Sequence, residues 1–170
     1  MNVQLPRPNW LHKTVKKLTS SRPGSWLLSH TLHHFDRIVV SLTRNRTSLT
    51  TVLTGLPVLI VTTQGAKTGK PRAVPLVGMP MGKDIILIAS NWGRAFHPAW
   101  YRNLKAHPTV TLSYRGQTAE YTARETEGEL REECWRRAVE GYPGYDAYKR
   151  RARTRQIPVI LLTPNIAKHL

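Results

Sequence analysis

A short segment rich in glycine, threonine and basic residues has the most evident chemistry in this sequence. It reads Thr62-Thr-Gln-Gly-Ala-Lys-Thr-Gly-Lys-Pro-Arg72. Glycines let backbone N–H groups turn toward phosphate oxygens, hydroxyls add donors, and Lys and Arg add charge-assisted hydrogen bonds. The pattern predicts an anion-binding loop, although the same composition is equally typical of a polar connection between two strands.

This loop is not the phosphate-binding loop of ATPases. Three residues rather than four separate Gly65 from Gly69, and Pro71 stands where a Ser or Thr would contact magnesium. ATP hydrolysis is therefore not expected.

Aromatic side chains form a second candidate group. They are Trp92, Phe96, Trp100, Tyr101, Tyr142, Tyr145 and Tyr148. The last three recur every third residue, which places them on one side of a helix that begins near Tyr142. Aromatic faces with a few hydroxyls suit a planar heterocycle or a quinone, and the alternative is that these rings are ordinary core and rim.

Other common catalytic arrangements are missing from the sequence. His97 and His107 both precede prolines, and no Gly-x-Ser-x-Gly motif occurs. His30 and His34 lie one helical turn apart, but no third ligand follows at a telling spacing, so no metal site is predicted. Cys134 is interpreted as a buried, inert thiol.

The composition indicates one compact domain with an anionic partner. The chain has 170 residues, a single cysteine, and 26 Lys and Arg against 10 Asp and Glu, for a net charge of +16. One cysteine excludes an internal disulfide, and the first residues hold no apolar run long enough for a signal peptide or a membrane span. The sequence therefore predicts a cytoplasmic protein.

The charge is unevenly distributed along the chain. Residues 111–170 carry much of the acidic charge, and the basic run 149–155 is interpreted as a solvated helix face.

Residues 1–50 are predicted to form a basic, amphipathic helical extension. Trp10, Leu11, Val15 and Leu18 fall on one face of a short helix, and Lys13, Lys16 and Lys17 fall on the other. A second helix from Ser25 has an apolar stripe of its own. These helices either pack on the rest of the protein or lie on an anionic membrane surface at the inner face of the cell membrane.

Residues 51–170 are predicted to form the second unit, which is mainly β. The expected strands are 58–63, 73–79, 84–89, 109–114, 117–123 and 157–163, with hairpin turns at 80–83 and 115–116. Helices are expected at 97–108, 129–140 and 142–152. Six strands with short turns indicate an α+β protein, a small antiparallel barrel or curved sheet with helices packed around it.

Several motifs in register resemble one family. They are Leu59-Ile-Val-Thr-Thr-Gln-Gly-Ala-Lys-Thr-Gly-Lys-Pro-Arg-Ala-Val-Pro-Leu76, Ala89-Ser90, Pro98-Ala-Trp-Tyr-Arg-Asn-Leu-Lys-Ala-His-Pro108, Tyr142-Pro-Gly-Tyr-Asp-Ala-Tyr148 and Ile157-Pro-Val-Ile160. This order resembles the deazaflavin-dependent nitroreductase and quinone reductase family, whose members are split β-barrels, similar to FMN-binding barrels, that use coenzyme F420. The resemblance covers about residues 56–164.

The resemblance implies an oxidoreductase that transfers a hydride from reduced F420 to a quinone, a nitroaromatic or an activated double bond. It implies that Ala66, Lys67, Thr68 and Arg72 hold the phosphate and the acidic tail, and that Ala73, Val74, Pro75, Ile88, Ala89, Ser90 and Asn91 line the deazaflavin and ribityl part. It further implies that Ala99, Trp100, Tyr101, Arg102 and Asn103 close the site together with Tyr145. Ser90, Tyr142, Tyr145 and Tyr148 would be the catalytic group on the acceptor side. Ala66 and Asn91 depart from the family pattern, which commonly has basic residues there.

Two other functions remain open from the sequence. A similar barrel could bind haem, a flavin or a lipid without reductase turnover. A basic nucleic-acid-binding module is the other alternative, but no recognisable motif for reading nucleic acid is present, so no nucleic-acid partner is expected.

Overall fold

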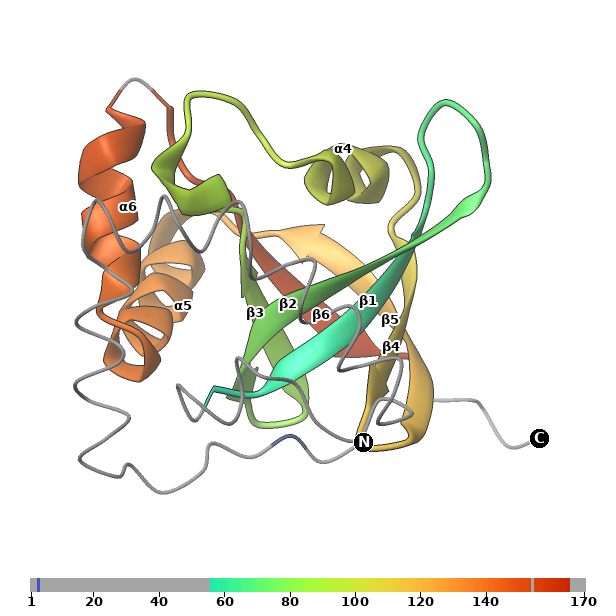
Figure 1. The fold of residues 1–170 in the computed structure, drawn as a ribbon. Coiled ribbons are helices and arrows are strands. Elements are labelled where there is room, and N and C mark those ends of the chain that lie inside the picture. Colours follow the sequence, from blue (N-terminus) through green and yellow to red (C-terminus); the bar gives the residue numbers. More distant parts are fainter. Residues whose placement is uncertain (1–2, 4–55, 154, 166–170) are drawn as a thin grey trace.

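A closed barrel of six antiparallel strands forms the centre of the protein (Figure 1). The computed structural model describes residue 3 and residues 56–153 and 155–165. The strands are β1 (Val58–Gln64), β2 (Pro71–Met81), β3 (Asp84–Ile88), β4 (Thr109–Tyr114), β5 (Gln117–Glu125) and β6 (Val159–Pro164). Their order around the barrel is β1-β2-β3-β6-β5-β4. The predicted α+β barrel is confirmed, and the predicted helices within residues 1–50 lie outside the described residues.

The two predicted hairpins have the expected turns. Met81 pairs with Asp84 across the turn of Gly82 and Lys83, and Gly82 has a φ of +63°. Arg115 and Gly116 join β4 to β5 with φ values of 50° and 80°. Two successive positive φ values match the twist of an antiparallel pair, which explains the short connection.

Two apolar cores lie on the two faces of the barrel wall. Inside the barrel, Ile85 and Leu87 of β3 meet Ile160 and Leu162 of β6. The alternate side chains of the same two strands point outward into a second core, formed with the helices that follow β5. Since both faces of β3 and β6 are buried, these strands read as continuous apolar runs in the sequence.

Three helices and one short 3-10 turn complete the described fold. They are the 3-10 turn η1 (Asn91–Gly93), α4 (Ala99–Ala106), α5 (Gly128–Gly141) and α6 (Gly144–Ala152). Helix α4 lies across one end of the barrel, and α5 and α6 stand together beside β3 (Figure 1). Trp100 and Leu104 of α4 insert into the interior core. Among the described helices, none combines the length and the apolar character that crossing a membrane requires.

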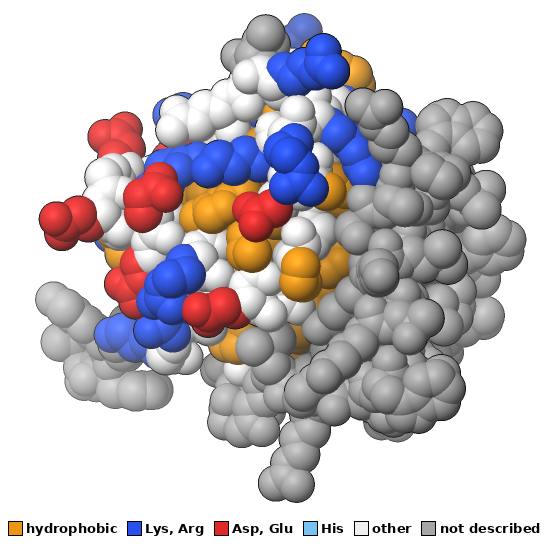
Figure 2. Space-filling view, turned by 90° about the vertical axis from the view of Figure 1, so that its left-hand side faces the viewer, with side chains coloured by type: hydrophobic (Ala, Val, Ile, Leu, Met, Phe, Trp, Pro, Cys, Tyr) orange, Lys and Arg blue, Asp and Glu red, His pale blue; other side chains and the backbone are white. Residues whose placement is uncertain are grey.

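The surface over α5 and α6 carries mixed charge. Arg136 pairs with Glu140 at 2.6 Å, and Arg137 pairs with Glu133 at 3.1 Å. Figure 2 shows acidic and basic side chains interspersed on this face around small apolar areas. Exposed pairs of this kind contribute little to stability, so the second core rather than these ion pairs holds the helices in place.

Candidate cofactor site

The predicted anion-binding segment forms a tight loop at the tip of the β1–β2 hairpin. Gly65 donates its N–H to the carbonyl of Lys70 at 2.9 Å and accepts from the N–H of Gly69 at 2.8 Å. A Cβ at Gly65 would lie 2.9 Å from the Thr68 hydroxyl, and Gly69 has a φ of +66°. The positive φ therefore favours glycine at position 69, a side chain at position 65 would crowd Thr68, and the turn leaves the Lys67 and Lys70 side chains exposed.

Asn103 of α4 joins this loop to the helix. Its Oδ1 accepts the backbone N–H of Ala66 at 3.1 Å, and its Nδ2 donates to the Thr63 hydroxyl at 3.0 Å. The Thr63 hydroxyl in turn donates to the carbonyl of Arg72 at 3.3 Å. Of the predicted cofactor residues, Ala66 is thus bonded directly to Asn103, and Arg72 is linked to it through Thr63.

Strand β2 continues from the loop as a surface of decreasing polarity. Arg72 and Ala73 are exposed, whereas Val74 and Pro75 are half-buried, and Val74 packs against the interior core. The outer end of β2, next to the loop, therefore carries cations, and the part of β2 nearer the barrel interior offers apolar surface. A ligand with a flat ring and an anionic tail matches this gradient.

The segment after β3 lies in a constrained conformation. Ile88 and Ala89 are buried in different cores, so their side chains serve packing, and Ser90 is 9% exposed. Asn91 and Trp92 have positive φ values of 46° and 59°. Such values cost non-glycine residues about 1–2 kcal/mol each and persist only where surrounding contacts impose them.

Close packing against α6 at Gly93 constrains this segment. A Cβ there would lie 2.9 Å from the Tyr148 carbonyl and 2.7 Å from the Arg151 Cβ, so only glycine fits against α6. The Asn91 side chain donates to the carbonyl of Phe96 at 2.9 Å. The Asn91 side-chain amide therefore closes the loop between residues 91 and 96.

Arg155 is the polar anchor of the same segment, and the sequence analysis missed it. The run 149–155 was interpreted as a solvated helix face, but α6 ends at Ala152 and Arg155 is half-buried. Its guanidinium donates to the carbonyls of Ala89, Ser90 and Arg94 and contacts His97, at 2.7–3.2 Å. The interpretation was wrong for Arg155 because charge clustering does not indicate where a helix stops.

Helix α4 sends its predicted site residues in different directions. Asn103 faces the loop, Trp100 fills the core, and Ala99 and Arg102 are exposed. The Tyr101 hydroxyl donates to Glu125 of β5 at 2.8 Å, away from the loop. Burial, together with this hydrogen bond to a carboxylate, raises the pKa of Tyr101 to about 12.

A cavity of about 660 Å³ opens on the Tyr101 side of α4. Its lining residues are Ala95, His97, Tyr101, Glu125, Thr126, Glu127, Gly128, Arg131, Arg155, Gln156, Ile157 and Pro158. Burial and the charge of Arg155 lower the pKa of His97 below its usual value of 6.5. This polar hollow lies on the side of α4 opposite to Asn103.

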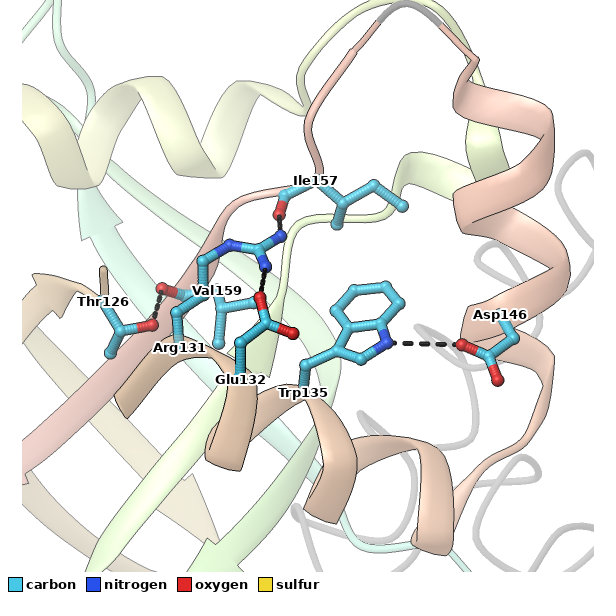
Figure 3. Close-up of polar contacts among 7 residues, drawn as sticks. All are labelled: Thr126, Arg131, Glu132, Trp135, Asp146, Ile157 and Val159. Carbon is cyan, nitrogen blue, oxygen red and sulfur yellow. Dashed lines mark hydrogen bonds and ion pairs between the residues drawn. The ribbon is translucent and has the colours of Figure 1, made fainter. Parts of the chain in front are cut away.

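Three of the lining residues, Thr126, Arg131 and Ile157, form hydrogen bonds at the junction between α5 and the chain that leads into β6 (Figure 3). Arg131 donates to the carbonyl of Ile157 at 3.2 Å and to Glu132 at 2.6 Å. The Thr126 hydroxyl donates to the carbonyl of Val159 at 3.0 Å. These bonds hold the chain that leads into β6 and so support the position of Arg155.

The three predicted acceptor-side tyrosines come together, but inside the second core. The hydroxyls of Tyr142 and Tyr148 lie 2.9 Å apart, and Tyr145 stands edge-on to both rings. Tyr145 is 5% exposed, and burial raises the pKa of its hydroxyl. The rings of Tyr148 and Trp92 meet edge to face with their centroids 5.8 Å apart. This contact links the tyrosine group to the segment that carries Ser90.

Comparison with known proteins identifies the relatives of this barrel. The model of the F420H(2)-dependent quinone reductase family matches residues 35–164. The chain belongs to this family. An F420H(2)-dependent quinone reductase of Mycobacterium tuberculosis is 33% identical over 110 residues, which are 63% of this chain and 73% of that protein.

Solved structures agree with the family assignment. A structure of an F420-H2 dependent reductase, FDR-A, is 43% identical, covers 62% of this chain and 93% of its own, and superposes with a TM-score of 0.58. HutZ, a haem storage protein of Vibrio cholerae, has a TM-score of 0.51 at 12% identity over 78% of this chain and 92% of its own. At that identity the likeness shows the fold alone.

The cofactor that gives the F420H(2)-dependent family its name fits the walls described above. F420 combines a flat deazaflavin ring with a phosphate and several carboxylates. The exposed cations of the loop match the anionic part, and the half-buried Val74 and Pro75 match the ring. The tight turn with glycine at positions 65 and 69 would let the loop backbone approach an anion closely.

Proposed function

We propose that this protein is a reductase that transfers a hydride from reduced F420 to a quinone. The family assignment supports the activity, and one structural observation supports the site. The basic β1–β2 loop runs directly into the apolar surface of β2, and Asn103 fixes the loop to α4. A single continuous wall thus offers cations to an anionic tail and apolar contacts to a ring.

The proposed cofactor contacts divide along this wall. Lys67, Thr68 and Arg72 bind the phosphate and the acidic tail through charge-assisted hydrogen bonds. Val74 and Pro75 pack against the ring, and the segment that contains Ser90 bounds its far side. When bound, reduced F420 supplies the hydride, and the quinone gains that hydride and one proton to become the quinol.

The acceptor is proposed to bind over Ser90 and the group of Tyr142, Tyr145 and Tyr148. Trp92 supports this placement because its ring joins Tyr148 to the Ser90 segment. A hydroxyl in this region would orient the quinone oxygen and donate to the negative charge that develops on it during transfer. Nitroaromatics and activated double bonds develop comparable charge and are the other candidate acceptors.

The decisive experiment mixes the purified protein with reduced F420 and menadione and follows the return of the visible absorbance of the oxidised cofactor. The absorbance should recover at a rate proportional to the protein concentration. Omitting the protein or menadione supplies the two controls. No recovery would contradict the reductase function, and haemin or FMN binding by spectral titration would then favour a barrel that only holds a ligand.

Residues 1–50 are proposed to hold the protein at an anionic membrane surface, where quinones reside. The support is in the sequence alone, since eight basic residues and one acidic residue accompany an apolar stripe. The full chain should then sediment with anionic vesicles at low salt but not with neutral ones. Deleting residues 1–20 should abolish sedimentation and preserve the reduction of soluble menadione. A full chain that stays in the supernatant would contradict the proposal.

A further inference from the structure

Arg155 makes an unusual set of contacts for a half-buried guanidinium. Nε donates to the Arg94 carbonyl at 3.1 Å, and Nη2 donates to the Ser90 carbonyl at 2.7 Å. Nη1 reaches the Ala89 carbonyl at 3.2 Å and Nδ1 of His97 at 3.1 Å. Four of the five N–H groups are therefore used on one short stretch of chain. Within the part of the chain that the structure describes, no carboxylate forms an ion pair with this residue.

These contacts enclose the two residues with positive φ. Ala89 and Ser90 precede Asn91 and Trp92, and Arg94 follows the turn. A segment with two such residues would relax to another conformation unless its ends were held. The guanidinium contacts the backbone on both sides of the turn and so holds it in the strained form.

The contact with His97 defines the protonation of that ring. A guanidinium has only donors, so Nδ1 of His97 must be the acceptor. The imidazole is therefore neutral and carries its proton on Nε2. The direction of the His97 pKa agrees, since burial and the charge of Arg155 both disfavour the imidazolium.

We propose that Arg155 is a positioning residue for the cofactor site. Its guanidinium holds the Ala89–Arg94 segment against the bound deazaflavin and keeps His97 in the Nε2–H form. The proposal rests on the proposed function, because that segment bounds the ring only if the cofactor lies along β2. Arg155 itself acts through the backbone and need not touch the ring.

The geometry explains why arginine is needed at this position. The acceptors lie on residues 89, 90, 94 and 97 and surround one planar group, which a fork of fixed N–H directions can satisfy at once. A lysine has the same charge, but its three N–H donors all leave from one nitrogen and cannot span these acceptors. Arg155→Lys is therefore expected to keep the charge and lose the clamp.

The test combines two variants with a cofactor-free measurement. Arg155→Lys and Arg155→Ala are titrated with F420 by fluorescence, beside Arg150→Ala, which removes an equal charge from an exposed site on α6. Both Arg155 variants should bind F420 about ten-fold more weakly or worse, since several charge-assisted hydrogen bonds are lost, and Arg150→Ala should bind normally. Guanidinium chloride, far below unfolding concentrations, should restore binding to Arg155→Ala, and sodium chloride of equal ionic strength should not.

Long-range ¹H–¹⁵N NMR of the unaltered protein without cofactor should show His97 as the Nε2–H form at neutral pH. A proton on Nδ1 would overturn the clamp, even if Arg155→Ala failed to fold. Normal F420 affinity in both Arg155 variants would overturn the positioning role while leaving the proposed function intact. If the unaltered protein did not bind F420, the positioning role would fall together with the proposed function.

Discussion

The backbone N–H of Ala66 donates to Oδ1 of Asn103 across 37 residues of sequence, at 3.1 Å. Through this bond the loop at the tip of the β1–β2 hairpin is fixed to α4. A hairpin tip of exposed residues would otherwise be mobile and would lose conformational entropy on binding an anion. The contact orders the loop before the ligand arrives, which favours binding.

Replacing Asn103 with alanine should weaken F420 binding. The change removes the bonds to Ala66 and to the Thr63 hydroxyl. With a net value of about 0.5–1.5 kcal/mol for each bond, the expected loss of binding free energy is at most about 1–3 kcal/mol. A fluorescence titration measures it, with Asn165→Ala as the control, because Asn165 bonds Thr122 on the exposed part of β5. Equal affinities in both variants would show that the loop needs no anchor.

The cations of the loop should account for the salt dependence of binding. Lys67→Ala and Arg72→Ala are each expected to cost about 1.5–3 kcal/mol of F420 binding free energy, the range for hydrogen bonds to charged groups. Lys83→Ala is the matched control, since Lys83 is an exposed lysine in the β2–β3 turn. Isothermal titration at several salt concentrations should show a shallower dependence for the two loop variants. A slope equal to that of Lys83→Ala would remove these residues from the site.

Tyr145→Phe should lower turnover while F420 affinity stays near normal. The ring remains in the second core, and only a hydroxyl that would contact the acceptor in the transition state is lost. The measurement is kcat with menadione beside an F420 titration. Tyr114→Phe serves as the control because Tyr114 lies in the interior core at the β4–β5 turn. Unchanged kcat in Tyr142→Phe, Tyr145→Phe and Tyr148→Phe alike would leave these rings with a packing role only.

Tyr101 should make stability fall at alkaline pH. Its pKa is raised from 10.0 to about 12 in the folded protein. Between these two pH values the folded protein keeps the phenol proton, which the unfolded chain has already released. The free energy of unfolding therefore decreases as the pH rises from about 10 to about 12. Urea unfolding across this range should show the decrease, and Tyr101→Phe should lack this part of it. A constant stability difference between the two proteins over the range would contradict the assigned pKa.

Much of the barrel could be predicted from the sequence because its signals are local. Apolar, β-branched runs marked the six strands to within a few residues, and Gly82 and Gly116, both with positive φ, marked the two hairpin turns. The loop at 65–70 was likewise visible, since its glycines, threonine and basic residues lie next to one another in the chain. The resemblance of several motifs to one family added the identity of the expected cofactor, F420.

Only the tertiary structure decided which of these residues meet. Asn103 and Tyr101 are two positions apart on α4, and the helical turn sends one to the loop and the other to Glu125. Arg155 looked like one more cation in a basic run, yet it binds the Ser90 carbonyl 65 residues away. Such contacts depend on where a helix ends and how the barrel closes. Both are set by the packing of the whole domain, and short-range periodicity contains no information about them.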